Sequence, residues 1–241
     1  MSAPVPWGAL EAVLLDVGNT VVGIDFELVS GSLEELGCAA GADELDRAEA
    51  AARPELSRLL SLGEGARREP FALLLEGILR RIPAAARDAQ GLAQRLAPLL
   101  CSPGRADLLW NRPLPAARGA LDLLARLGVP VVAVSNSDGT AERSLERAGL
   151  RDGFRAVIDS HRIGAEKPDP AIFRAALAAA GAAPERAVHA GDLYAVDVVG
   201  ARRAGAHAVL IDPHGDWNGI DCARARDVGE LAERLRAARG A

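Results

Sequence analysis

From about residue 112 to the end of the chain, strand-like segments alternate with helical ones, and this alternation limits the fold more than any other feature of the sequence. Segment 129–135, VPVVAVS, is a continuous and mostly β-branched run, which is typical of a strand buried on both faces. Strands that alternate with helices pair in parallel through right-handed crossovers, so the sequence predicts an α/β fold with three α/β/α layers around a Rossmann-like parallel sheet. Its other strands are expected in segments 12–17, 154–160, 186–192 and 207–213.

Helices are expected between these strands and after the last of them. Segment 169–181 carries three boundary signals: Asp169 can cap the helix, Pro170 suits its first position, and Gly181 suits its end. The remaining helices of this part are expected in segments 139–150, 194–206 and 228–239.

Residues 24–111 contain no convincing strand, and their apolar residues, such as Leu74 and Ile78, follow helical spacing. Glycines at 63–65 and Pro83 divide the segment into several helices. The sequence therefore predicts two domains: an α/β core domain of residues 1–23 and 112–241, and an α-helical cap domain of residues 24–111 inserted after the first strand.

The composition excludes several classes of protein. The 241 residues are 49% hydrophobic and 25% charged, which is ordinary for a globular protein. A net charge of −5 does not favour nucleic acid or an anionic membrane as a partner, and no apolar run approaches the length of a membrane span. Three widely spaced cysteines indicate neither a disulfide framework nor a zinc site. The first residues do not resemble a secretory signal, so a cytoplasmic location is expected, and the oligomeric state stays open, a homodimer included.

Polar residues stand where the predicted strands end, which is the edge at which open parallel sheets bind ligands. Each of them alone has an ordinary explanation as a turn, cap or surface residue. Their occurrence in this order at successive strand ends indicates a functional site. The residues are Asp16 after the first strand, Ser135 and Asn136 after the next, Lys167 in a later loop, and Asp192 and Asp197 after the strand at 186–192.

These residue types match the requirements of phosphoryl transfer. Asp16, Asp192 and Asp197 would bring three carboxylates together, which is unfavourable unless a cation neutralises them, and such oxygen ligands suit Mg²⁺. Ser135 precedes a helix N-terminus, where an anion such as phosphate binds readily. Lys167, the only lysine of the chain, can pair with that anion or with Asp16. A carboxylate nucleophile, Mg²⁺ and an anion site together favour a reaction through an aspartyl-phosphate.

Four stretches also carry a family resemblance. LLDVGNT (14–20) is similar to a DxDGT or DxDNT motif, and VVAVSNS (131–137) to a strand that ends in Ser or Thr. IGAEKPDPAIF (163–173) resembles GxxKPDPxIF, and the stretch 189–213 resembles GDxxxxD followed by GAxxAG. In these motifs the chain resembles the haloacid dehalogenase superfamily, whose members are mostly Mg²⁺-dependent phosphatases. The helical insertion is similar in position to the α-helical cap of one subfamily.

The resemblance implies a role for each site residue and a small phosphorylated metabolite as substrate. Asp16 would be the nucleophile, and Ser135, Asn136 and Lys167 would bind the phosphoryl group. The Mg²⁺ ligands would be Asp16, the carbonyl of Gly18, Asp192, and Asp197, the last of which would bind or orient the metal.

Gly18 departs from the family pattern. Phosphatases of the family usually have an aspartate there, which protonates the leaving group and later activates water. A positioned general acid–base group contributes about 10²–10⁴ in rate, so weak turnover of alkyl phosphates is expected, with acyl and aryl phosphates least affected. A substitute acid could come from Asp25, Glu27 or His161.

Two alternatives to a phosphatase stay open. The chain could be a catalytically impaired regulatory module that binds metal and phosphate. It could also be a metal-independent 2-haloacid dehalogenase, because dehalogenases of the family lack the second aspartate too. The acidic stretch 191–197 and the few aromatic residues of 24–111 favour the phosphatase over the dehalogenase. His189, close to this stretch, is interpreted as a histidine of the strand core.

Overall fold

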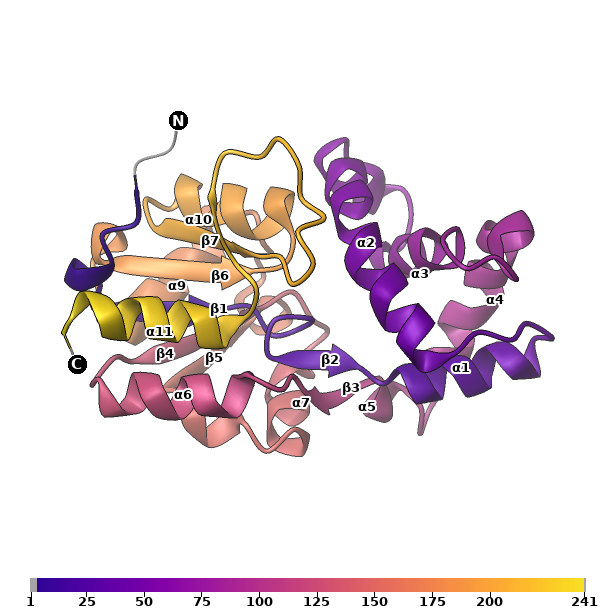
Figure 1. Ribbon diagram of the computed structural model, residues 1–241, viewed down its shortest axis with the longest axis horizontal. Helices are drawn as coiled ribbons and strands as arrows, with labels where there is room; N and C mark the ends of the chain where they lie inside the picture. Colours follow the sequence, from indigo (N-terminus) through magenta and orange to yellow (C-terminus); the bar gives the residue numbers. More distant parts are fainter. Residues whose placement is uncertain (1–3, 241) are drawn as a thin grey trace. The chain divides into compact units, whose positions relative to one another are not determined.

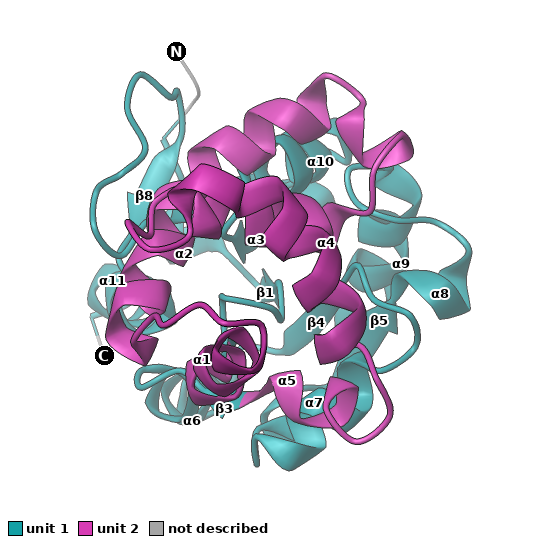
Figure 2. Ribbon diagram, turned by 90° about the vertical axis from the view of Figure 1, so that its right-hand side faces the viewer, with its two compact units in different colours: residues 1–23, 112–241 teal, residues 24–111 magenta. Residues whose placement is uncertain are grey.

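A computed structural model describes residues 4–240, which form two compact units (Figure 2). One unit contains the described residues up to Gly23 and those from Arg112 onward, and the other is Ile24–Asn111. The chain passes between the units within a two-stranded sheet of β2 (Val22–Ile24) and β3 (Trp110–Pro113). Strands this short give no alternating pattern, so the sequence did not indicate them.

The first unit is built on a six-stranded parallel sheet with the order β5-β4-β1-β6-β7-β8 (Figure 1). Counted along the chain, these strands have the order 3-2-1-4-5-6, which is that of dinucleotide-binding α/β sheets. The predicted parallel α/β fold is therefore confirmed. The strands are β1 (Ala12–Leu15), β4 (Val131–Ser135), β5 (Ala156–Asp159), β6 (Ala187–Gly191), β7 (His207–Ile211) and β8 (Ala223–Ala225).

Helices cover both faces of this sheet (Figure 1). On one face, α9 (Pro170–Ala180) and α10 (Val199–Arg203) form a continuous apolar core with strand residues such as Leu14 and Val132. On the other face, α6 (Ala117–Arg126) packs against α11 (Val228–Ala238). The two shorter helices α7 (Ala141–Arg147) and α8 (Ser160–Ile163) follow β4 and β5.

The boundary signals of α9 act as predicted. Asp169 caps the helix by accepting the N–H of Ala171 at 2.8 Å, and Gly181 ends it in the left-handed conformation, with φ of 71°. The helix expected at 194–206 differs from the prediction, because it begins with a π-helical turn, Tyr194–Val198, before α10. Such π-helical turns are frequent at functional sites.

The second unit is helical, as its apolar spacing predicted. Leu33, Leu75, Ile78 and Leu96 are among its fully buried side chains. The predicted breaks at 63–65 and Pro83 fall between successive α-helices. Within residues 4–240, no helix combines the length and the apolar character that a bilayer crossing needs. The helices of this unit are α1 (Phe26–Glu35), α2 (Ala42–Ser61), α3 (Pro70–Leu79), α4 (Ala89–Leu100) and α5 (Ala106–Leu109).

Candidate functional site

The carboxyl ends of three neighbouring strands bring the candidate residues to one edge of the sheet. Leu15 of β1 pairs with Ala133 of β4 on one side and with Ala190 of β6 on the other. Asp16 therefore follows β1 between the end of β4 and the end of β6, and its N–H donates to the carbonyl of Ala190 at 2.9 Å. In a sheet of this order, ligands bind where the strand order reverses, which here is between β1 and β6. Asp16, Ser135 and Asp192 are all buried at this edge.

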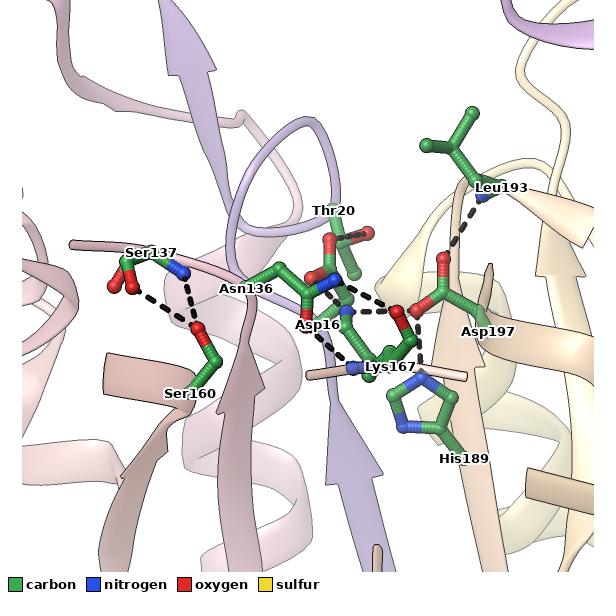
Figure 3. Close-up of polar contacts among 9 residues, drawn as sticks. All are labelled: Asp16, Thr20, Asn136, Ser137, Ser160, Lys167, His189, Leu193 and Asp197. Atoms are coloured by element: carbon green, nitrogen blue, oxygen red, sulfur yellow. Dashed lines mark hydrogen bonds and ion pairs between the residues drawn. The ribbon is translucent and has the colours of Figure 1, made fainter. Parts of the chain in front are cut away.

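Lys167 connects two of the three predicted carboxylates. Its Nζ donates to Oδ1 of Asp16 at 2.5 Å and to Oδ1 of Asp197 at 2.8 Å (Figure 3). Burial disfavours the charged amine, but attraction by Asp16 and Asp197 outweighs burial and raises the pKa of Lys167 above its ordinary value. The side chain is thus a fixed ammonium that contacts the proposed nucleophile directly.

Both oxygens of the Asp197 carboxylate have protein partners. Oδ1 is shared between Lys167 and Nε2 of His189, which lies 2.9 Å away, and Oδ2 accepts the N–H of Leu193 at 2.9 Å (Figure 3). Burial opposes ionisation, but Lys167 and His189 together bring the pKa of Asp197 below its ordinary value. These contacts fix the orientation of the Asp197 carboxylate within the site.

Both oxygens of Asp16 accept hydrogen bonds, but its ionised form is disfavoured. Oδ2 accepts the hydroxyl of Thr20 at 3.1 Å, while Oδ1 accepts Lys167. Burial raises the pKa of Asp16, the ammonium of Lys167 opposes this, and the charge of Asp197 adds to it, with a net rise. A further cation near Asp16 would therefore stabilise the ionised carboxylate that a nucleophile requires.

The donor set at this edge fits Mg²⁺. Two buried carboxylates, Asp16 and Asp197, share the ammonium of Lys167, and Asp192 is buried at the same edge, so a cation there would offset excess negative charge. Asp16, Asp192 and the carbonyl of Gly18 supply hard oxygen donors, and Mg²⁺ commonly keeps several waters beside one or two carboxylates. In the turn around Gly18, the carbonyls of Val17 and Val22 accept the backbone hydrogen bonds. Within residues 4–240, no three His, Cys, Asp or Glu side chains form a metal site by themselves. A magnesium site here therefore also needs the carbonyl of Gly18 and water as ligands.

The amide of Asn136, predicted to bind the phosphoryl group, contacts the backbone of Lys167. Its Oδ1 accepts the N–H of Lys167 at 2.7 Å, and its Nδ2 donates to the carbonyl of Lys167 at 2.9 Å (Figure 3). This two-point contact fixes the backbone of Lys167 beside the end of β4. The side chain of Asn136 thus acts on the position of Lys167.

Asp159, at the end of β5, was missed by the sequence reasoning. Its Oδ2 accepts the hydroxyl of Ser137 at 2.5 Å and the N–H of Ala141 at 3.3 Å, and its Oδ1 accepts the N–H of His161 at 3.0 Å. These bonds join the loop after Ser135 to the segment that leads to Lys167. The signal was present, because Asp159 is a polar residue at a strand end like the others.

The three candidate substitute acids are divided between the two units. His161 lies at the end of β5, which β4 separates from β1. A Cβ atom built on Gly139 would lie 3.4 Å from Cδ2 of His161, so the His161 ring faces the loop after β4. Asp25 caps α1 by accepting the N–H of Leu28 at 3.1 Å, and Asp25 and Glu27 both belong to the second unit.

Gly191 is needed for the position of Asp197, and this gives a first prediction. A Cβ atom built on Gly191 would lie 2.2 Å from Cγ of Asp197, so Gly191→Ala must displace that carboxylate. We expect Gly191→Ala to lower the free energy of unfolding by about 1–3 kcal/mol in denaturant titrations, as overpacking does. Gly119→Ala, in α6 with open space around it, is the control and should raise stability by about 0.5–1 kcal/mol. Equal stability of Gly191→Ala and the parent chain would contradict this explanation.

With this geometry in place, comparison with known proteins identifies the family. A family model for hydrolases, described as haloacid dehalogenase-like hydrolase, matches residues 10–205. The chain belongs to this family. Curated relatives match only part of the chain, and the chain spans 59% of their length or less in the three cases given next.

Two of these three relatives are named as phosphatases. Phosphoserine phosphatase of Thermus thermophilus is 41% identical over 99 residues, which are 41% of this chain and 40% of that protein. Glyceraldehyde 3-phosphate phosphatase of Methanothermobacter thermautotrophicus is 32% identical over 133 residues, 52% of this chain and 59% of that protein. Haloacid dehalogenase-like hydrolase domain-containing protein 3 of Bos taurus is 38% identical over 128 residues, 53% of this chain and 50% of that protein.

Solved haloacid dehalogenase-like structures share the fold over nearly the whole chain. A HAD-hydrolase from Bacillus subtilis bound to magnesium has a TM-score of 0.64 and 20% identity, and covers 94% of this chain and 98% of that one. L-2-haloacid dehalogenase from Xanthobacter autotrophicus has a TM-score of 0.60 and 17% identity, with the same coverage. Because both a magnesium-bound hydrolase and a dehalogenase match, the fold alone does not select the reaction.

Proposed function

We propose that this chain is a Mg²⁺-dependent phosphatase that acts on a small phosphorylated metabolite through an aspartyl-phosphate on Asp16. The observation that carries the proposal is the ammonium of Lys167, which lies between Asp16 and Asp197 at the carboxyl ends of β1 and β6. Kinship with two proteins named as phosphatases supports the same reaction. Residues 24–111 would act as the cap domain that selects the substrate.

In the proposed reaction, a carboxylate oxygen of Asp16 attacks phosphorus, and the bond between phosphorus and the leaving oxygen breaks. Lys167 and Ser135 hold the phosphoryl oxygens, and Asp197 holds Lys167. Water then attacks phosphorus, which releases inorganic phosphate and restores the Asp16 carboxylate. Bound Mg²⁺, held by Asp16, Asp192 and the carbonyl of Gly18, would neutralise charge on the phosphoryl oxygens.

The leaving oxygen departs with a negative charge unless it receives a proton. Gly18 has no side chain to donate one, and His161, a candidate replacement in the same unit, lies at the end of a different strand. Substrates whose leaving group is stable as an anion, such as acyl or aryl phosphates, should therefore react fastest. This expectation distinguishes the chain from a phosphatase with a complete acid–base pair.

A dehalogenase is the second candidate, and one observation favours it. Both oxygens of Asp197 already have protein partners, which is compatible with a site that works without metal. In that reaction, Asp16 would attack the carbon that bears the halogen, and halide would leave without needing a proton. The buried Asp192 and the excess of negative charge at the site weigh in the opposite direction.

Metal removal separates these candidates and gives a second prediction. We expect hydrolysis of acetyl phosphate and p-nitrophenyl phosphate to fall at least tenfold after EDTA treatment and to return with added Mg²⁺, because the excess negative charge would otherwise repel the phosphoryl group. Phosphate release, measured at several Mg²⁺ concentrations, reports the result.

Two further assays, run on the same preparations, complete the test. Halide release from 2-chloropropionate in the presence of EDTA would support the dehalogenase and contradict the phosphatase. Binding of a phosphate analogue without turnover on a broad panel of phosphorylated metabolites would support the regulatory module.

A further inference from the structure

The buried side chain of His189, which shares Asp197 with Lys167, has no role in the chemistry proposed above. His189 lies in the middle of β6, and its ring is fully buried. The ring packs edge-to-face on Phe173 of α9, with centroids 5.0 Å apart and ring planes at 87°. This is a favoured aromatic geometry, so packing holds the imidazole in one orientation.

The ring of Phe173 packs closely against Gly200 of α10. A Cβ atom built on Gly200 would lie 2.4 Å from Cε2 of Phe173 and 3.0 Å from Cα of Pro168, the residue after Lys167. Glycine at this position thus allows α10 to pack closely on α9 and on the loop that carries Lys167. The orientation of the His189 ring is therefore set by helix packing that includes the immediate neighbour of Lys167.

Within the described part of the chain, the imidazole hydrogen-bonds a single partner, Asp197. Nε2 lies 2.9 Å from Oδ1 of Asp197, and because the carboxylate accepts, Nε2 carries the proton (Figure 3). Nδ1 is buried and has no hydrogen-bond partner among residues 4–240. An unpaired buried polar atom destabilises the fold, so an apolar residue would suit this core position better unless the Nε2–H donor has a function.

We propose that His189 is a positioning residue: its Nε2–H holds the Asp197 carboxylate, which holds the ammonium of Lys167 against Asp16. The three contacts follow one another: His189 to Asp197 at 2.9 Å, Asp197 to Lys167 at 2.8 Å, and Lys167 to Asp16 at 2.5 Å. Without His189, Oδ1 of Asp197 would lose one of its two donors. The Asp197 carboxylate would then be less firmly held, and so would the ammonium of Lys167 that it positions against Asp16. The effect on turnover rests on the proposed phosphatase function, whereas the effect on Lys167 does not.

The sequence offers a direct probe of this series of contacts, because Lys167 is the only lysine. Selective nitrogen-15 labelling of lysine gives a single side-chain Nζ signal in NMR spectra. In the parent chain, that signal should exchange slowly with water, since Nζ is buried and bonded to two carboxylates. In His189→Leu it should shift and exchange faster.

A pair of amide substitutions isolates the Nε2 donor from the other properties of histidine. The amide nitrogen of glutamine reaches the position of Nε2, whereas that of asparagine reaches only the position of Nδ1. We therefore expect His189→Gln to keep the Nζ signal close to that of the parent chain, and His189→Asn to resemble His189→Leu. The two amides differ by one methylene, so they carry the test even where His189→Leu fails to fold.

Turnover of p-nitrophenyl phosphate should follow the same order. We expect kcat of His189→Asn and His189→Leu to fall about 10–100-fold, as is typical when an outer partner of a site is lost, with KM changed less than kcat. His189→Gln should stay within about threefold of the parent kcat, since it keeps the donor. The matched control is His207→Leu on the neighbouring strand β7, where Nε2 lies 3.1 Å from the carbonyl of Glu185; its kcat and Nζ signal should be unchanged.

The outcomes separate this proposal from the proposed function. Parent-like Nζ signals in folded His189→Asn and His189→Leu, or equal kcat for the Gln and Asn variants, would overturn the positioning role. An Nζ signal that depends on residue 189 as described, in a chain without phosphatase turnover, would support the positioning role and remove the phosphatase. Thermal unfolding of every variant shows whether a loss reflects global destabilisation instead.

Discussion

Replacing Asp16 with asparagine should abolish phosphatase turnover, with a loss of at least about 10³-fold in kcat, because an amide cannot form the acyl phosphate. The substitution preserves the shape of the side chain, and its carbonyl oxygen can still accept from Lys167. Lys167 also keeps Asp197 as a charged partner at 2.8 Å, so the buried ammonium is not left unpaired. The fold is therefore expected to survive.

Initial rates on acetyl phosphate and p-nitrophenyl phosphate, with thermal unfolding of the same preparations, check this result. Purification of Asp16→Asn and the parent chain side by side also shows whether a measured activity belongs to this protein. Turnover by Asp16→Asn within tenfold of the parent chain would contradict nucleophilic catalysis by Asp16.

Introducing the missing acid at Gly18 should raise turnover selectively. We expect Gly18→Asp to increase kcat/KM on an alkyl phosphate such as glycerol phosphate by roughly 10²-fold or more, within the range that a positioned general acid–base group contributes. Acetyl phosphate should gain little, because its leaving group departs readily as an anion. The selectivity is the important result, since a general improvement in binding or folding would raise both rates together.

Gly18→Asn is the matched control for this experiment, because it adds a side chain of the same shape that cannot transfer a proton. Rates of Gly18→Asp and Gly18→Asn on both substrates, taken across a range of pH, provide the comparison. Equal rates for the two variants, or an equal gain on both substrates, would show that Gly18 does not limit proton transfer.

The residues that face the site could be predicted because their signals are local. Asp16 follows an apolar run at once, and Ser135 ends another, so the parallel fold placed both at one edge of the sheet. The pairing of Lys167 with Asp16, 151 residues apart in the chain, was also anticipated, and their side-chain atoms are 2.5 Å apart. The other partners of Lys167 and Asp197 are long-range contacts without a local signal.

The sequence reasoning was weakest where a side chain has several available partners. For Asn136, the sequence carried no sign of the contacts between its amide and the backbone of Lys167, 31 residues away. His189 read as an ordinary core residue because its apolar neighbours give no sign of the Asp197 contact. Within the π-helical turn, Asp197 makes two contacts with Leu193: its N–H donates to the Leu193 carbonyl, and its Oδ2 accepts the Leu193 N–H.

The central claim is that Asp16 carries the phosphoryl group during turnover. The most direct test is to react the parent chain with acetyl phosphate and Mg²⁺, quench it in acid, reduce it with borohydride and map the peptides by mass spectrometry. We predict that the acyl phosphate forms on Asp16, so that only this residue is converted to homoserine, and that the conversion is absent in Asp16→Asn. Phosphate release with Asp16 unmodified, or a phosphoryl group trapped on another residue, would contradict the account.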